Sequence, residues 1–401
     1  MIKLDKTLIK GSFILLVVFN LYSLLNFIFQ SSMARFLTVA EYGILAALFY
    51  FVYLLGIYSE AIQTIITRYT ASEANLGKLK NMLKRALKKS WVIAIISFLV
   101  YNVIAIPLSA VLNIPYFLLF LTGFAIGAAF FLPITRGILL GRRRFTVLGM
   151  NMIIESSSKL ILATILVLLG WKIYGALIGL LVGVFLALGI SFLSLKKVLQ
   201  AKEEQADMSG IYGYSGPVFT IIFALQLFFI IDILIAQAVF SKDIAGYYAI
   251  ASMLSKIIFW GTQPISRAMF PLAAEKQNNN KRESRYLNAL GFLSICIFGI
   301  LILFLLFPEE IIFLFSGRNI SESTEILLYL GIATSLLSFA NLNILYKISR
   351  GKTANAYLFL IILLIGVGLL LYFNHSLIEY TIAFLLTSAI FLWASIMLLK
   401  K

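Results

Sequence analysis

The chain has 401 residues, of which 61% are hydrophobic and only 12% are charged, and its mean hydropathy is +1.00. A soluble domain of this composition would expose apolar surface on every side, so the composition excludes a soluble protein and indicates a polytopic membrane protein. The 33 lysines and arginines exceed the 17 aspartates and glutamates, which gives a net charge of +16. Because these cations cluster in short segments between apolar runs, they indicate membrane orientation and contact with anionic lipid, and they argue against nucleic acid as a partner.

Apolar runs long enough to cross a bilayer recur along the whole chain, and they predict about twelve transmembrane helices. The runs lie at residues 11–32, 42–67, 91–112, 115–140, 147–170, 173–194, 215–239, 246–271, 287–307, 324–346, 354–374 and 376–399. With the N-terminus inside, only Arg35, Lys172, Lys242 and Arg318 among the loop cations fall in outer loops. This bias predicts that both termini are cytoplasmic.

The most polar stretch lies near the middle of the chain and predicts a division into two six-helix bundles. We expect an N-terminal bundle at 1–200, a cytoplasmic linker at 201–213 and a C-terminal bundle at 214–401. Short echoes support related halves, since FLTVAEYG at 36–43 resembles VFSKDIAG at 239–246. Six helices return the chain to its starting side, so such halves would be parallel and related by an axis along the membrane normal.

The fifth span carries a polar stripe inside an apolar run. Asn151, Glu155 and Lys159 follow one another at steps of four residues and therefore share one helix face. A charge at the bilayer centre costs at least ~2.5–3.5 kcal/mol on insertion scales, so this face should meet protein or a watery cavity. Glu155 and Lys159 either neutralise one another in a helix contact or take part in transport. The sixth span carries glycines at steps of four, which predict a close-packing ridge.

Polar side chains also follow one face of spans one, two, seven, eight and ten, whereas most other spans are nearly all apolar. They are Asn20, Ser23, Asn26 and Gln30; Glu60 and Gln63; Gln226 and Asp232; Ser252, Lys256 and Gln263; and Ser338 and Asn341. Polar helices around a centre with apolar helices outside are typical of a water-accessible cavity. We therefore expect these residues to line a central cavity between the two bundles.

Ionisable residues inside the spans each need a partner or a function. Lys256 has no partner within its own helical turn, so it either pairs with Asp232 on the neighbouring span or contacts substrate. Asp232 either forms this pair or couples transport to an ion. Arg68, Arg136 and Arg267 lie near the inner ends of their spans, where we interpret them as snorkelling to lipid headgroups.

Enzyme signatures are missing from the sequence. It contains no GxxxxGK[ST] phosphate loop, no HExxH and no cluster of cysteine and histidine, since Cys296 and His375 are single. The longest outer loop, at 308–324, is too short for a soluble catalytic domain. We therefore expect a transporter that is not an enzyme and that uses no metal and no cofactor beyond a coupling ion.

Several segments resemble one known family. They are ARFLTVAEYGILAAL at 34–48, TRYTAS at 67–72, RGILLGRRRF at 136–145, DILIAQAVFSKDIAGYYAIASML at 232–254 and SRAMFPLAAE at 266–275. These segments resemble the polysaccharide-transporter branch of the multidrug/oligosaccharidyl-lipid/polysaccharide flippase superfamily, and the resemblance covers nearly the whole chain. It implies a V-shaped pair of bundles that opens alternately inward and outward and flips prenyl-(pyro)phosphate-linked oligosaccharides.

The resemblance, together with the polar stripes, suggests roles for individual residues. Cations that would hold the anionic head group are Lys159, Lys256, Arg68 and Arg267. Carboxylates that would couple the cycle to H⁺ or Na⁺ are Glu60, Glu155 and Asp232. The expected protein is a monomer in the cell membrane, with lipid-linked glycan as substrate and glycosyltransferases or a glycan polymerase as partners.

Two other functions stay open. A cation-coupled multidrug exporter of the same superfamily would need a net acidic, aromatic-lined cavity, whereas the cations of the expected cavity at least equal its carboxylates. A non-transporting membrane scaffold of a glycan-assembly complex would not require polar stripes in six helices. The balance of charge therefore favours a flippase for an anionic lipid-linked glycan.

Overall fold

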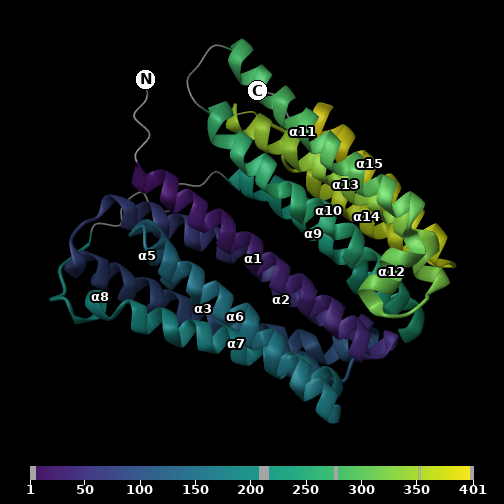
Figure 1. The fold of residues 1–401 in the computed structure, drawn as a ribbon, viewed down its shortest axis with the longest axis horizontal. Coiled ribbons are helices and arrows are strands. Elements are labelled where there is room, and N and C mark those ends of the chain that lie inside the picture. The colour runs from purple at the N-terminus through teal and green to yellow at the C-terminus, as the bar shows by residue number, and fades with distance from the viewer. Residues whose placement is uncertain (1–5, 207–215, 275–278, 351, 353, 398–401) are drawn as a thin grey trace. The chain divides into compact units, whose positions relative to one another are not determined.

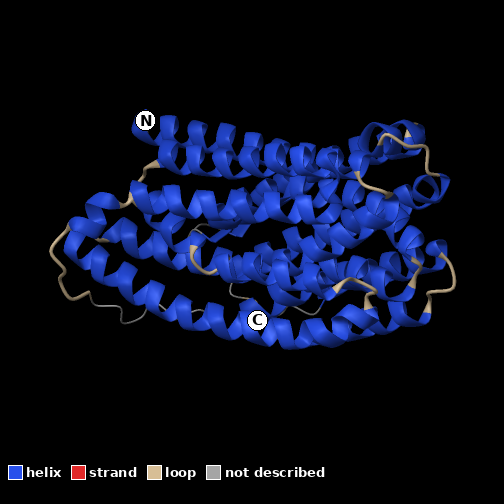
Figure 2. Ribbon diagram, turned by 90° about the horizontal axis from the view of Figure 1, so that it is seen from below, coloured by secondary structure: helices blue, strands red, loops and turns tan. Residues whose placement is uncertain are grey.

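The computed structural model describes residues 6–206, 216–274, 279–350, 352 and 354–397. All regular structure in these residues is helical (Figure 2). The chain divides into two compact units, one of Met1–Glu41 with Phe51–Gly213 and one of Tyr42–Tyr50 with Tyr214–Lys401. The second unit thus includes nine residues of an early helix, whereas the predicted division at the linker places these residues in the N-terminal bundle.

Nine segments of the described chain are long and apolar enough to cross a membrane. One of them, Phe145–Ser194, has 50 residues and contains two helices, because Gly170 breaks it at a φ of 90°. Val39–Leu54 and Leu358–Tyr372 are shorter apolar helices. Nine segments, one of them double, and two shorter helices together give the predicted twelve. The prediction of an all-α, multi-pass membrane protein is confirmed.

The first unit consists of the helices from α1 to α8 without Tyr42–Tyr50 of α2, and all of them except α4 are labelled in Figure 1. Their bounds are α1 (Lys6–Phe36), α2 (Val39–Ser72), α3 (Leu76–Val111), α4 (Tyr116–Ala128), α5 (Leu132–Gly141), α6 (Phe145–Leu166), the π-helical turn Val167–Trp171, α7 (Lys172–Ser194) and α8 (Lys196–Gln200). Helix α6 packs against both α7 and α1. A Cβ on Gly179 of α7 would lie 2.6 Å from the backbone nitrogen of Ala163 on α6, so these two helices meet at a distance that only glycine permits.

The second unit consists of the later helices and the start of α2. Their bounds are α9 (Gly216–Val239), α10 (Lys242–Ala274), α11 (Asn279–Leu306), α12 (Pro308–Ser316), α13 (Ser321–Ser349), α14 (Leu358–Tyr372) and α15 (Leu377–Met397). Helix α13 packs against α10, α11 and α15 and forms the core of this unit. A Cβ on Gly43 would lie 2.9 Å from the backbone of Gly246, so the glycines of the two echoing segments touch each other.

The start of α2 and the break between α4 and α5 both follow from local chemistry. Thr38 and Glu41 form a capping box, in which each backbone N–H donates to the other's side chain, so a new helix begins directly after α1. Pro133 has no N–H to donate to the carbonyl of Ala129, and the Ser59 hydroxyl donates to that carbonyl at 2.7 Å instead. The break between the helices is therefore stabilised by α2.

The segment after α8 returns to the beginning of α3. Glu203 accepts hydrogen bonds from Lys84 and, at 2.8 Å, from Asn81. A Cβ on Gly77 would collide with the carbonyl oxygen of Lys202, so the segment lies directly against the helix. This contact, which we call the linker clasp (residues 201–206 on 75–84), anchors the start of the linker to the first unit.

Candidate functional site

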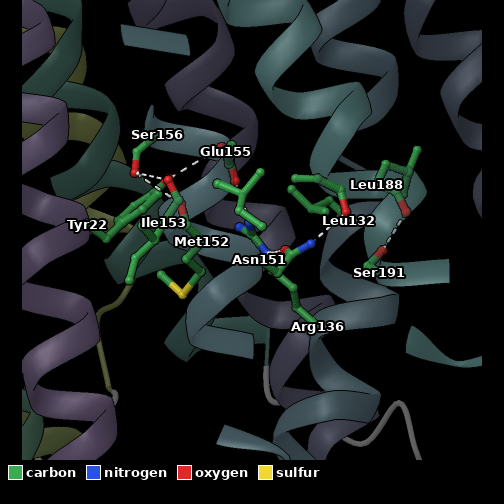
Figure 3. Close-up of polar contacts among 12 residues, drawn as sticks. Tyr22, Leu132, Arg136, Asn151, Met152, Ile153, Glu155, Ser156, Leu188 and Ser191 are labelled. Carbon is green, nitrogen blue, oxygen red and sulfur yellow. Dashed lines mark hydrogen bonds and ion pairs between the residues drawn. The ribbon is translucent and has the colours of Figure 1, made fainter. Parts of the chain in front are cut away.

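Arg136 on α5 lies at the centre of a buried polar cluster in the first unit (Figure 3). Only 9% of the residue is exposed. Its Nε donates to Asn151 Oδ1 at 2.9 Å, and its guanidinium forms an ion pair with Glu155. The interpretation that Arg136 snorkels to headgroups was wrong, because its donors bind partners inside the protein. The break at Pro133 begins α5 one turn before Arg136, which helps to place the guanidinium inside the bundle.

Asn151 and Tyr22 complete the arrangement around this ion pair. The amide of Asn151 donates to the carbonyl of Ala187 on α7 at 2.6 Å, so its oxygen is fixed toward Arg136. The Tyr22 hydroxyl on α1 donates to Glu155 Oε1 at 3.4 Å. Glu155 thus receives bonds from both α5 and α1, and the cluster joins α1, α5, α6 and α7.

Lys159 lies one helical turn beyond Glu155 and is 6% exposed. Its ammonium donates to Asn26 Oδ1 and lies 4.7 Å from the centroid of the Phe29 ring. The Asn26 amide nitrogen donates to the carbonyl of Tyr22 at 2.8 Å, which turns the amide oxygen toward the lysine. An amide oxygen and an aromatic face both orient an ammonium. Arg136, Glu155 and Lys159, with Tyr22, Asn26 and Asn151, are called the N-terminal cluster below.

A second ionic cluster lies in the other unit, around Asp232 on α9. Lys256 of α10 donates to Asp232 Oδ1 at 2.7 Å, and Tyr248 and Ser252 of the same helix donate to Oδ2 at 3.0 and 2.9 Å. The Tyr380 hydroxyl of α15 donates to the Asp232 carbonyl at 2.6 Å. Each of these five residues is fully buried, at 0% exposure. We call them the C-terminal cluster.

Two alternatives were open for Lys256, a pair with Asp232 or contact with substrate. In the C-terminal cluster Lys256 forms the pair with Asp232. The ammonium also lies 4.4 Å from the centroid of the Tyr50 ring and 5.2 Å from that of Phe229. With 0% exposure, Lys256 presents no surface to a ligand in this conformation. The geometry is that of an internal ion pair, and direct contact with a head group requires another conformation.

The remaining residues predicted to line the cavity have mixed positions. On α1, Asn20 and Ser23 are exposed, whereas Gln30 is half-buried and its Oε1 has no hydrogen-bond partner among the described residues. Gln63 is half-buried. The side chains of Glu60 and Arg68 lie outside the described residues.

In the second unit Gln226 and Gln263 are half-buried and Arg267 is exposed. Ser338 is buried and donates to the Thr334 carbonyl of its own helix at 3.0 Å, and Asn341 is 9% exposed. The structure therefore brings Asn26, Glu155 and Lys159 together with Asn151, and Asp232 together with Ser252 and Lys256, but it does not bring the other predicted residues into either cluster.

Sequence reasoning missed the tyrosines and Arg136 as members of these clusters. Tyr248, Ser252 and Lys256 follow one another at steps of four residues, so their common face was detectable. Tyr22 likewise precedes Asn26 by one turn. The roles of Arg136 and Tyr380 depend on contacts between helices distant in sequence, for which a single sequence carries no signal.

Comparisons with known proteins agree with the fold. A family model described as polysaccharide biosynthesis protein matches residues 32–325. An uncharacterised membrane protein of Methanocaldococcus jannaschii is 25% identical over 397 residues, and the match covers 94% of each chain. The structure of the lipid II flippase MurJ in an inward closed conformation matches with a TM-score of 0.72 and 15% identity, over 95% of this chain and 86% of that one.

Two further solved structures are transporters of the MOP superfamily. An inward-facing multidrug resistance MATE family transporter matches with a TM-score of 0.68 and 15% identity, over 94% of this chain and 92% of that one. A transporter from Pyrococcus furiosus, noted for the reverse polarity of its binding pocket, matches with a TM-score of 0.62 and 15% identity, over 96% and 92% of the two chains. At these identities the likeness shows a shared fold alone.

Proposed function

The chain belongs to the polysaccharide biosynthesis protein family, and from this premise we propose that it flips a prenyl-(pyro)phosphate-linked oligosaccharide across the cytoplasmic membrane by alternating access. The sugars and the phosphate of such a substrate cannot cross hydrocarbon unaided, because their polar groups would lose their hydrogen bonds to water. The prenyl chain can remain in lipid while the protein shields the polar head.

The observation that carries the proposal is the ammonium of Lys159. It is buried, it is oriented by Asn26 and Phe29, and it belongs to a cluster whose three charged groups are two cations and one carboxylate. Charge-assisted hydrogen bonds from such a group to phosphate oxygens are strong where water is excluded. We assign first contact with the head group to Lys159, with Arg267 and Arg68 as further cations nearer the cytoplasm.

We assign coupling to H⁺ or Na⁺ to the carboxylates Asp232 and Glu155, with Glu60 as a third candidate. Asp232 is held by Lys256, so protonation of this carboxylate would remove the charge that retains the ammonium. Lys256 would then be released to move, which links ion uptake to a change in the second unit. Both termini would be cytoplasmic, and the protein would work as a monomer in the cell membrane beside glycosyltransferases or a glycan polymerase.

The test is transport by purified protein in liposomes, with a prenyl diphosphate that carries a fluorescently labelled disaccharide. We expect wild type to move the label to the opposite leaflet and Lys159→Gln to slow this by about tenfold or more, since a hydrogen bond to a charged group is worth ~1.5–3 kcal/mol. Lys159→Arg should keep part of the activity, because the charge remains but its geometry changes.

Lys172→Gln is the matched control. Lys172 is an exposed cation at the start of α7, and it pairs with Glu41 of α2. It should transport at the wild-type rate. Wild-type transport by Lys159→Gln would refute the role of Lys159. Export of an organic cation without any movement of the glycolipid would instead identify a multidrug exporter, and no transport of either probe would favour a scaffold.

A further inference from the structure

A groove on the surface of the first unit has no part in the transport cycle proposed above. Its volume is about 780 Å³, and it is lined by side chains of α3, of α4 with the turn that follows it, and of α7. The lining is apolar and largely aromatic, including Trp91, Phe131 and Phe192, and Lys88 is its one charged member. We call it the α3 groove.

The groove has free space at Gly127, next to the break between α4 and α5. Helix α4 ends at Ala128, and the chain resumes as a helix at Leu132, with Pro133 in its first turn. Gly127, in the last turn of α4, lines the groove, and a Cβ on this glycine would meet no atom within 4 Å. The groove therefore has free space at the residue where a side chain would otherwise fill it.

The length of the groove along α3 is close to the thickness of one membrane leaflet. On α3 its lining runs from Leu87 to Leu99 along one helix face. Twelve residues of α-helix rise about 18 Å, and a leaflet contributes about half of a hydrocarbon core of about 30 Å. An apolar channel of this length fits one acyl chain that begins at the membrane surface.

The charged end of the groove has the chemistry of a headgroup site. Lys88 is exposed there, and Trp91, one turn deeper, is 61% exposed with its ring centroid 5.8 Å from that of Phe131. Tryptophan is enriched at the level of lipid headgroups, and lysines beside a membrane attract anionic lipid. Arg85 and Lys89 add positive charge on the neighbouring turns of α3.

We propose that the α3 groove binds one anionic glycerophospholipid, with its phosphate on Lys88 and an acyl chain along the aromatic wall between α3 and α7. The length of the groove and the position of Lys88 at one end favour a lipid from the leaflet at the cationic end of α3. The charge of Lys88 favours an anionic headgroup over a zwitterionic one. The bound lipid fills the space at Gly127 and joins α3 to α4 and α7 where protein contacts leave a gap. This site is separate from the one that holds the transported glycan.

Native mass spectrometry of the purified full chain tests the proposal, with phosphatidylglycerol and phosphatidylcholine as probes at equal concentration. Wild type should retain one phosphatidylglycerol with at least tenfold preference. Lys88→Gln should reduce its affinity by about tenfold, consistent with the strength of a hydrogen bond to a charged group. Gly127→Leu should also reduce it, because the new side chain occupies the position of the acyl chain, and leucine is tolerated in a helix better than glycine.

Arg85→Gln is the control for charge, because Arg85 is exposed on the same segment of α3 but does not line the groove. It should change the affinity by less than about threefold. Equal losses for Lys88→Gln and Arg85→Gln would show diffuse attraction and overturn the proposal. So would equal binding of the two phospholipids, or displacement of phosphatidylglycerol by an equal concentration of prenyl phosphate. Thermal unfolding of each variant in lipid-free detergent should match wild type, and a large loss of stability for Gly127→Leu would leave Lys88→Gln as the deciding variant.

Discussion

The N-terminal and C-terminal clusters both bury charge inside a helix bundle, but they balance it differently. In the N-terminal cluster Arg136 and Lys159 accompany one carboxylate, Glu155, whereas in the C-terminal cluster Lys256 faces Asp232 one to one. Two hydroxyl groups also donate to Asp232, so its carboxylate accepts three hydrogen bonds and is balanced by one lysine. The C-terminal cluster holds one cation for one carboxylate, and we propose that the two cations of the N-terminal cluster serve an anionic substrate. The comparison is the basis of our proposal that the first unit contacts substrate and that the second contains an internal switch.

The largest effect is expected from breaking the C-terminal pair on one side. Asp232→Ala leaves the Lys256 ammonium fully buried without its carboxylate, and loss of one partner of a buried pair costs ~3–5 kcal/mol. We expect a large fall in membrane abundance and in the thermal unfolding temperature of the purified protein. The double variant Asp232→Leu/Lys256→Met should recover most of both, because two apolar side chains of similar size replace the pair.

The double variant also separates a switch from a purely structural pair. If the pair couples transport to an ion, the recovered protein should move glycolipid without response to a pH or Na⁺ gradient. If transport by the double variant instead depends on the gradient as strongly as transport by wild type, Asp232 has no part in the coupling mechanism. A single Asp232→Ala variant that is as stable as wild type would contradict the assignment of the cluster as a closed ion pair.

The sequence predicted the helices well because their apolar runs and charge bias are local properties. It also placed Asn151, Glu155 and Lys159 on one face from their spacing alone. It did not predict that Glu155 would pair with Arg136, because that contact depends on the break at Pro133 and on how α5 packs against α6. The rotation and packing of helices are set by many distant contacts, which no spacing within one helix reveals.

The same limit explains the two lysines. Lys159 and Lys256 look alike in the sequence, each a lysine in the interior of an apolar span. Their environments differ because Asp232 reaches Lys256 from another helix, while α1 brings Asn26 and Phe29 to Lys159. The two lysines are thus distinguished by their partners from other helices.

The next largest effect is expected at Glu155. Glu155→Gln keeps the shape of the side chain but removes the charge that pairs with Arg136. The guanidinium of Arg136, a residue that is buried in the wild type, then loses its carboxylate and keeps Asn151 as a neutral partner. We expect a loss of about 3 kcal/mol, at the lower limit for breaking a buried pair, because the amide oxygen can still accept a hydrogen bond. Thermal unfolding measures it, and Ser158→Ala on the same helix is the control. A loss smaller than that of the control would show that Arg136 is stabilised elsewhere.

A smaller change in stability is expected at Lys159, which sharpens the contrast with Lys256. Lys159→Gln keeps a donor for Asn26 and removes a buried charge, so the unfolding free energy should change by less than about 1 kcal/mol. Lys256→Gln should destabilise by several times as much, because it leaves Asp232 buried without a cation. Parallel unfolding curves of the two variants in one detergent make the comparison. Equal destabilisation would mean that Lys159 is as much a structural ion as Lys256.

The smallest effect is expected at the exposed ion pair of Lys84 and Glu203. This pair shows how much of the effect expected at the two buried clusters depends on burial. In the linker clasp, the pKa of Glu203 lies below its ordinary value of 4.5. The hydrogen bond from Lys84 has the largest effect on this pKa, and the hydrogen bond from Asn81 has the next largest. The folded pKa is lowered, so the contribution of Glu203 is fully present above the ordinary value and is lost as the pH falls through the lowered one. Exchange of backbone hydrogens at residues 201–206, measured between pH 6 and pH 3, should therefore accelerate relative to the intrinsic rate at the acid end. Glu203→Gln should abolish this relative change, because it cannot titrate. A clasp that opens to the same degree in wild type and Glu203→Gln throughout this range would show that the apolar contacts of the segment, and not the exposed pair, hold it on α3.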